Sequence, residues 1–170
     1  MDVQTSRGKT RWIESSGGPF VVLPASQRSV WSGGDGPDYD MACEVDDHLG
    51  LVQSAAQSEA LALVVADEPL TSAFVDDIGA VLQWQYAPSD EALLSAARHS
   101  VESLDWVAGP TLDVPGELVM FDAVVPGNSL RPDETLLIAL PPGRYRTATA
   151  DFAVGADVCG RLHRFRGHEG

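Results

Sequence analysis

Four acidic side chains fall within ten residues of one another, a density of oxygen ligands that could hold a divalent cation. They are Asp35, Asp38, Asp40 and Glu44. Calcium and magnesium both prefer carboxylate oxygens. The segment does not match the calcium-loop motif, because no glycine and no closing glutamate stand at the required positions. A metal-dependent hydrolase using these carboxylates is therefore the less favoured alternative, and the sequence predicts neither a bound metal nor a cofactor.

No other pattern in the sequence indicates catalysis. The histidines are His48, His99, His163 and His168, and the sequence has no Cys-x-x-Cys and no His-x-x-x-His pair for a structural zinc site. A Gly-x-Ser-x-Gly elbow and a phosphate-binding glycine loop are both missing from the sequence. Adjacent carboxylates on a strand point to opposite faces, which does not suit paired acid–base chemistry. The sequence thus predicts a protein that is not an enzyme.

The charge of the chain is large and unevenly distributed. The 170 residues include 11 basic and 25 acidic ones, for a formal net charge of −14. Between Asp35 and Asp122 there are 18 acidic residues and a single basic one, Arg98. Such a surface repels the phosphates of nucleic acid and attracts basic proteins. We therefore expect a basic protein partner and no nucleic-acid partner.

Length and composition indicate a single globular domain. Hydrophobic residues make up 44% of the chain, enough for a core of ordinary size. The longest apolar runs, residues 61–66 and 136–140, are too short to cross a membrane. No apolar stretch follows the N-terminus, so a cytoplasmic location is expected, with no membrane partner. In that reducing compartment Cys43 and Cys159 are expected to be buried free thiols.

Short strand patterns dominate the chain, and one segment favours a helix. Helix formation is expected over residues 89–99, where Ser89 precedes two acidic residues and apolar residues at helical spacing. Residues 39–46 alternate between apolar and mostly acidic side chains, which predicts a strand. A Pro-Pro-Gly turn at 141–143 predicts a hairpin between residues 136–140 and 145–149. Further strands are expected at 12–14, 20–23, 49–52, 60–66, 80–86, 105–107, 118–121 and 161–166.

The expected fold class is α+β and mainly β, with an antiparallel sheet or sandwich-like core and one principal helix. Residues 11–167 are expected to form one domain after a flexible N-terminal tail at 1–10. Tyr39, between two aspartates, is the best candidate for an exposed aromatic contact, whereas Trp84 and Tyr86 are expected in the core. The predicted partner-binding residues are Asp35, Asp38, Tyr39, Asp40, Glu44, Asp46, Asp47, Asp67, Glu68, Asp76 and Asp77.

Four segments occur in an order that resembles a bacterial immunity family. They are residues 12–19 (WIESSGGP), 38–45 (DYDMACEV), 66–70 (ADEPL) and 140–146 (LPPGRYR). Over about residues 12–165 the chain resembles the immunity protein 21 type, which is encoded beside polymorphic toxins. This resemblance implies a mostly β protein that protects the producing cell by neutralising a cognate toxin. It implies no particular contact residues.

The resemblance and the charge lead to the same functional expectation. A non-enzymatic immunity protein would bind one toxin domain, with its acidic surface occluding a basic cleft, and nucleases are among the toxins that have such clefts. An acidic regulatory module for another basic protein is the alternative, which a toxin gene next to this gene would argue against. The oligomeric state stays open.

Overall fold

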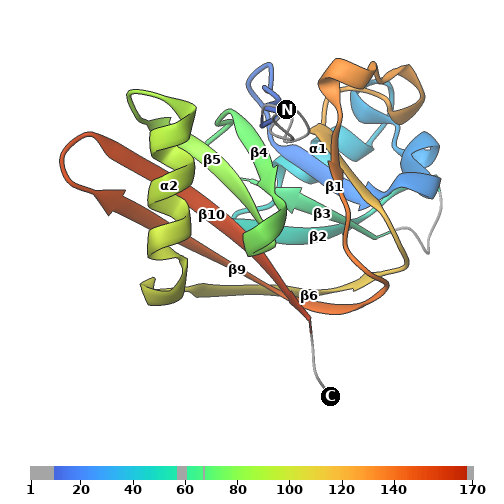
Figure 1. Cartoon of the computed structure of the whole chain (residues 1–170). Helices are drawn as coiled ribbons and strands as arrows, with labels where there is room; N and C mark the ends of the chain where they lie inside the picture. Colours follow the sequence, from blue (N-terminus) through green and yellow to red (C-terminus); the bar gives the residue numbers. More distant parts are fainter. Residues whose placement is uncertain (1–9, 57–60, 67, 168–170) are drawn as a thin grey trace, which may run out of the picture.

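Two five-stranded antiparallel sheets pack face to face in the computed structural model, which describes residues 10–56, 61–66 and 68–167 (Figure 1). The β1 sheet consists, in spatial order, of β2 (Leu49–Gln53), β3 (Leu61–Val65), β1 (Phe20–Pro24), β7 (Leu118–Asp122) and β8 (Leu136–Ile138). The β10 sheet consists of β4 (Ser72–Val75), β5 (Ala80–Tyr86), β10 (Val158–Gly167), β9 (Gly143–Val154) and β6 (Val107–Val114). The mainly β, sandwich-like expectation is confirmed.

The main core lies between the two sheets, and each sheet also has a covered outer face. In β1, Phe20 and Val22 face the core between the sheets, whereas Val21 and Leu23 face an outer layer. Burial on both faces explains why this strand and β3 read as unbroken apolar runs rather than as alternating patterns. The strands expected at 20–23 and 60–66 are thereby confirmed.

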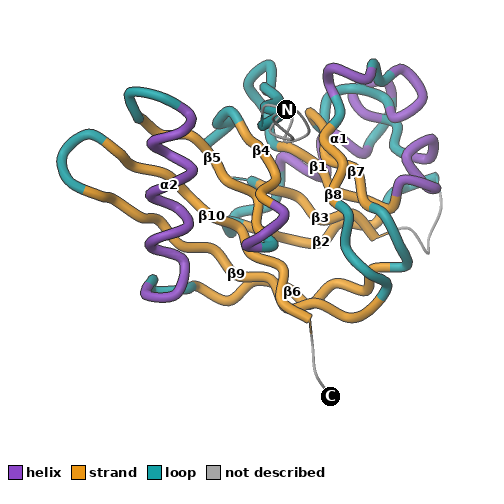
Figure 2. Tube along the Cα trace, in the orientation of Figure 1, coloured by secondary structure: helices purple, strands orange, loops and turns teal. Residues whose placement is uncertain are grey.

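Helices cover the two outer faces. The principal helix, α2 (Asp90–Ser100), crosses the outer face of the β10 sheet and buries Leu93 and Ala97 against it (Figure 1). Its N-cap is Ser89, whose side chain accepts a hydrogen bond from the Ala92 amide at 3.1 Å, as the sequence predicts. The short helix α1 (Asp38–Cys43) and several 3-10 turns cover the β1 sheet instead, and Figure 2 shows these short helical turns gathered at the opposite end of the molecule from α2.

Trp31 holds this second outer layer together. The indole is 1% exposed and donates a hydrogen bond from Nε1 to the carbonyl of Ala123 at 2.8 Å. The Trp31 carbonyl accepts from the amide of Gly127, at 2.9 Å. Gly127 lies so close to the carbonyl of Arg28 that no side chain fits there. The turns η2 (Ala25–Val30) and η6 (Gly127–Ser129) are therefore locked to each other, and they fix the start of the segment that leads into α1.

The strand predicted at residues 39–46 is wrong, because α1 occupies most of that segment. Asp38 and Ala42, one helical turn apart, are both fully buried, while Asp40 and Cys43 are exposed. Over only six residues the periods of a strand and a helix are hard to tell apart. The helix begins directly after Pro37, and its first residue, Asp38, is buried.

The predicted hairpin around the Pro-Pro-Gly turn is also wrong. β8 pairs with β7, whereas β9 pairs with β10 and β6, so residues 141–143 carry the chain from one sheet to the other. The Tyr145 hydroxyl donates to the carbonyl of Pro141 at 2.7 Å and braces this crossing. Near the N-terminus, the strand predicted at 12–14 is only an isolated bridge between Ile13 and Ser72. β4 was not predicted, and β6 begins at Val107, where the strand predicted at 105–107 ends.

The outermost strands of the two sheets lie beside each other. β2 of the β1 sheet neighbours β6 of the β10 sheet, and β8 neighbours β4 on the other side. The sandwich therefore has two seams, each formed by one strand from each sheet. The predicted N-terminal tail lies outside the described residues except for Thr10.

Candidate functional site

Five exposed carboxylates lie along one segment of the chain beside the β1 sheet. They follow the turn η3 (Gly33–Asp35), the helix α1 and the loop that leads into β2. In the part of the chain that the structure describes, none of the five takes part in an ion pair. The acidic face is defined by Asp35, Asp40, Glu44, Asp46 and Asp47.

Asp38 belongs to the same segment but points inward. Its side chain is 0% exposed. One carboxylate oxygen accepts hydrogen bonds from the Ser32 amide at 2.9 Å and the Ser54 hydroxyl at 2.8 Å, and the other accepts from the Ala55 amide at 2.9 Å. Burial by itself raises the pKa of Asp38, but the hydrogen bonds from Ala55, Ser32 and Ser54 outweigh it and lower the pKa below its ordinary value. Asp38 thus anchors the acidic face from below and is not available for contact with a partner.

Tyr39 is half-buried and packs against the outer core of the β1 sheet. Its hydrogen bond with the Cys43 thiol raises the pKa of Tyr39, and burial and the nearby charges of Asp122 and Asp40 act in the same direction. Tyr39 therefore borders the acidic face as a neutral side chain. Cys43 itself is exposed and Cys159 is half-buried, so both thiols are free but the expectation that they are buried is wrong.

The remaining predicted contact residues lie apart from the acidic face. Asp76 and Asp77 are in η4 (Asp76–Ile78), between two strands of the β10 sheet. The Asp77 carboxylate pairs with both Nε and Nη2 of Arg98 on α2, at 2.9 and 3.1 Å, and this contact raises the pKa of Arg98. Glu68 is exposed in the loop after β3, and Asp67 lies outside the described residues.

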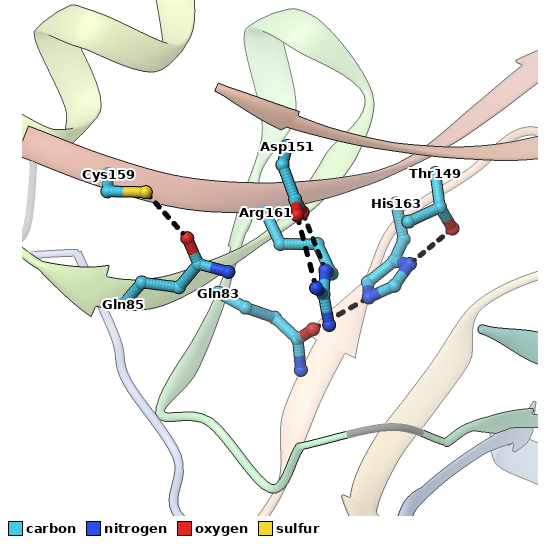
Figure 3. Close-up of polar contacts among 7 residues, drawn as sticks. All are labelled: Gln83, Gln85, Thr149, Asp151, Cys159, Arg161 and His163. Atoms are coloured by element: carbon cyan, nitrogen blue, oxygen red, sulfur yellow. Dashed lines mark hydrogen bonds and ion pairs between the residues drawn. The ribbon is translucent and has the colours of Figure 1, made fainter. Parts of the chain in front are cut away.

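A row of polar side chains that was not predicted from the sequence lies on the inner face of the β10 sheet (Figure 3). His163 is 1% exposed and lies between two partners: Nδ1 is 2.8 Å from the Thr149 hydroxyl, and Nε2 is 2.7 Å from Oε1 of Gln83. Gln83 in turn donates from Nε2 to the Ser72 hydroxyl at 3.1 Å, which identifies its Oε1 as the acceptor. His163 must then carry its proton on Nε2 and accept from Thr149 at Nδ1.

An ion pair between a buried arginine and an exposed aspartate continues this polar row. Arg161 is 7% exposed, and its guanidinium meets the Asp151 carboxylate through Nε at 2.7 Å and Nη2 at 3.2 Å. Nearby, the Cys159 thiol donates to Oε1 of Gln85 at 2.8 Å. Figure 3 shows these side chains side by side on neighbouring strands. Because the hydrogen-bonding groups are matched to one another, the row is suited to fixing strand register rather than to acid–base chemistry.

The burial of His163 leads us to expect a distinct pH dependence of the free energy of unfolding. Burial, followed by the charges of Arg161 and His48, lowers the pKa of His163 to about 3, with Asp151 acting weakly in the opposite direction. Between that value and the ordinary pKa of about 6.5, only the unfolded chain binds the proton. The free energy of unfolding should therefore fall as the pH drops below about 6.5, by up to about 1.4 kcal/mol per pH unit from this group.

Urea denaturation at several pH values, for the wild type and for H163Q, measures this contribution as the difference between the two slopes. H99Q, at the exposed His99 on α2, makes the same substitution outside the core and serves as the comparison variant. Equal slopes for wild type and H163Q would show that His163 titrates alike in the folded and unfolded chain.

The described residues offer no support for a metal centre. Within 10–56, 61–66 and 68–167, no three His, Cys, Asp or Glu side chains are grouped so as to hold a metal ion. Asp38, one of the four carboxylates considered for that role, is already occupied by its three hydrogen bonds. A search of the same residues for a helix long and apolar enough to cross a membrane finds none.

Comparison with known protein families gives a match over most of the chain. The family model described as Immunity protein 21 matches residues 11–158, which include every strand from β1 to β9 and the acidic face. No curated protein and no solved structure matches the chain.

Proposed function

This chain belongs to the immunity protein 21 family, and from that membership we propose that it binds a cognate bacterial toxin and neutralises it through the acidic face. The observation that carries the choice of surface is the set of five exposed carboxylates without an ion pair in the described residues. Carboxylates that are not already neutralised within the protein are free to attract a basic partner. The acidic pair Asp76 and Asp77 is a weaker candidate, because Arg98 already compensates part of its charge.

Occlusion of a basic cleft follows from this charge. A toxin that acts on nucleic acid needs a cationic cleft to hold phosphates. A surface of closely spaced carboxylates competes for the same cations, and long-range attraction speeds the encounter. We therefore infer that the toxin has a basic substrate-binding surface, with nucleases as the leading class, and that the inhibitor performs no chemistry of its own.

The layer beneath the acidic face supports this role by holding the carboxylates in place. Asp38 ties the start of α1 to Ser32 on one side and to the turn at Ser54 and Ala55 on the other. A surface that is ordered before binding loses less conformational entropy when the complex forms. Tight binding by a short helix and two loops is then reasonable without any rearrangement of the sandwich.

A protection assay tests the proposal. The C-terminal domain of the large open reading frame beside this gene is expressed in a sensitive host, with and without this protein, and the two proteins are then co-purified. We expect rescue of growth and a one-to-one complex that weakens as salt is raised. An unrelated toxin domain serves as the specificity control and should not be neutralised. If the neighbouring domain kills the host in the presence of well-expressed inhibitor and no complex is recovered, the proposal is wrong for that pair.

A further inference from the structure

A cleft of about 340 Å³ opens at the seam between β2 and β6. One wall is formed by the entry into β2, and the other by the first half of β6, where the pairing with β9 shifts register between Ala108 and Thr111. Thr149, which is opposite Val107 on β9 and only 3% exposed, forms the floor. The lining residues are Asp47, His48, Leu49, Gly50, Val107, Ala108, Gly109, Pro110 and Thr149.

The hydrogen bonds behind the cleft determine what its floor can offer. The Thr149 hydroxyl has one hydrogen to donate and two lone pairs to accept with. Its hydrogen is used on Nδ1 of His163, because Nε2 of that ring must donate to Gln83. The Thr149 oxygen can therefore only accept from a group that enters the cleft. The hydrogen bonds from Ser72 through Gln83 and His163 to Thr149 thus make the floor of the cleft a hydrogen-bond acceptor.

The rim of the cleft also offers a hydrogen-bond acceptor. Asp47, a member of the acidic face, is exposed, and an ionised carboxylate only accepts hydrogen bonds. The lining also includes two apolar residues, Pro110 and Val107, the latter 56% exposed. An apolar wall together with two acceptors suits a side chain that has an apolar stem and a head that only donates.

Arginine has that composition. Its guanidinium carries five N–H donors and no acceptor, and its three methylene groups pack well on apolar surface. The neighbouring cation of the protein, Arg161, does not oppose it strongly, because Asp151 pairs with Arg161 in a bidentate contact. His48 also lines the cleft and is engaged within the protein.

We propose that this cleft is the socket for one arginine side chain of the toxin, with its N–H groups directed at the Asp47 carboxylate and the Thr149 oxygen. The identity of the partner rests on the proposed function, whereas the preference for a guanidinium rests on the cleft alone. Buried arginines surrounded by weaker contacts often dominate the affinity of protein interfaces. The acidic face would then attract the toxin, and the socket would fix its position.

The probe for this proposal is N-acetyl-arginine methylamide, titrated into the whole protein at pH 8 and followed by amide chemical shifts. We expect saturable shifts at residues 47–50 and 107–109. The citrulline analogue, which has the same shape without the charge, should bind about tenfold more weakly or not at all.

Two single-carboxylate variants give the matched comparison. D47N removes the charge at the rim, and about a tenfold weaker binding of the arginine probe is expected. D157N makes the same change of net charge in the exposed turn between β9 and β10 and should bind as the wild type does. T149V removes the acceptor at the floor, and T149S keeps it. Since D47N alters only an exposed side chain, the test does not depend on whether T149V folds.

Shifts that do not saturate, equal affinity for citrulline and arginine, or unchanged affinity in D47N would each overturn the proposal. These outcomes are separate from failure of the proposed function, because the titration contains no toxin. Arginine binding without protection would leave the socket in place for another basic partner. Protection without arginine binding would support the immunity function and show that the proposed arginine socket is wrong.

Discussion

Converting the five carboxylates of the acidic face to amides should slow association with the toxin by about tenfold to a hundredfold at low salt. The variant is D35N/D40N/E44Q/D46N/D47N, which changes the formal net charge from −14 to −9. Electrostatic steering acts before contact, so its loss appears in the association rate and shrinks as added salt screens the charges. Stopped-flow association measured at several ionic strengths gives both the rate and its dependence on salt.

A second five-fold variant separates the acidic face from the total charge. E91Q/E102Q/D105N/D113N/D157N also brings the net charge from −14 to −9, but it changes exposed side chains on α2, on the β10 sheet and on their connections. We expect it to slow association far less than the acidic-face variant. Equal effects of the two variants would mean that only the total charge matters, and the proposed location of the contact would then be wrong.

The largest effect on stability is expected from D38A, which should lower the free energy of unfolding by about 3 kcal/mol. Three donors, the amides of Ser32 and Ala55 and the hydroxyl of Ser54, would lose their acceptor at a site shielded from water. D38N keeps the size of the side chain but presents an NH₂ group to donors, so it should recover only part of the loss. Chemical denaturation of D38A, D38N and wild type measures these differences.

D40A is the matched control, since Asp40 lies on the same short helix and is exposed. Its replacement should change stability by less than about 0.5 kcal/mol. The sign of the pH dependence gives a further check. Because the pKa of Asp38 is lowered on folding, its stabilising contribution is present above the ordinary pKa of about 3.9 and disappears as the pH falls through the lower folded value. A wild type no more stable than D38A at pH 7 would contradict the anchoring role.

Those parts of the fold that depend on local chemistry could be predicted from the sequence. Ser89 followed by acidic residues specifies the start of α2, because the capping bond to Ala92 is made within three residues. Apolar runs such as residues 20–23 specify strands buried on both faces. Pairing between strands could not be predicted in the same way. The Pro-Pro-Gly turn suits a hairpin locally. However, β9 makes its longest pairing, of ten residue pairs, with β10, the strand that follows it in the chain.

In the candidate site, too, features set by local sequence could be predicted and features set by distant residues could not. Exposed carboxylates in a stretch of nearly one charge sign could be placed on the surface from the sequence, because such side chains are costly to bury. Asp38 breaks that rule through partners 16 and 17 residues away, which no local pattern reveals. His163 and Gln83 are 80 residues apart and meet only after β5 and β10 pair. The alternation of Arg161, His163 and Phe165 on one face of β10 was the available signal for this polar row.

The two seams of the sandwich have a consequence for the behaviour of the protein at high concentration. An unprotected outermost strand offers free amide and carbonyl groups to which a strand of another molecule can add, and aggregation often begins there. In the part of the chain that the structure describes, β2 lies beside β6 and β4 lies beside β8. Each edge strand of one sheet is therefore covered by an edge strand of the other. The stoichiometric inhibition proposed above would require this protein in excess of its target. We therefore expect this architecture to disfavour self-assembly through strand addition at high concentration.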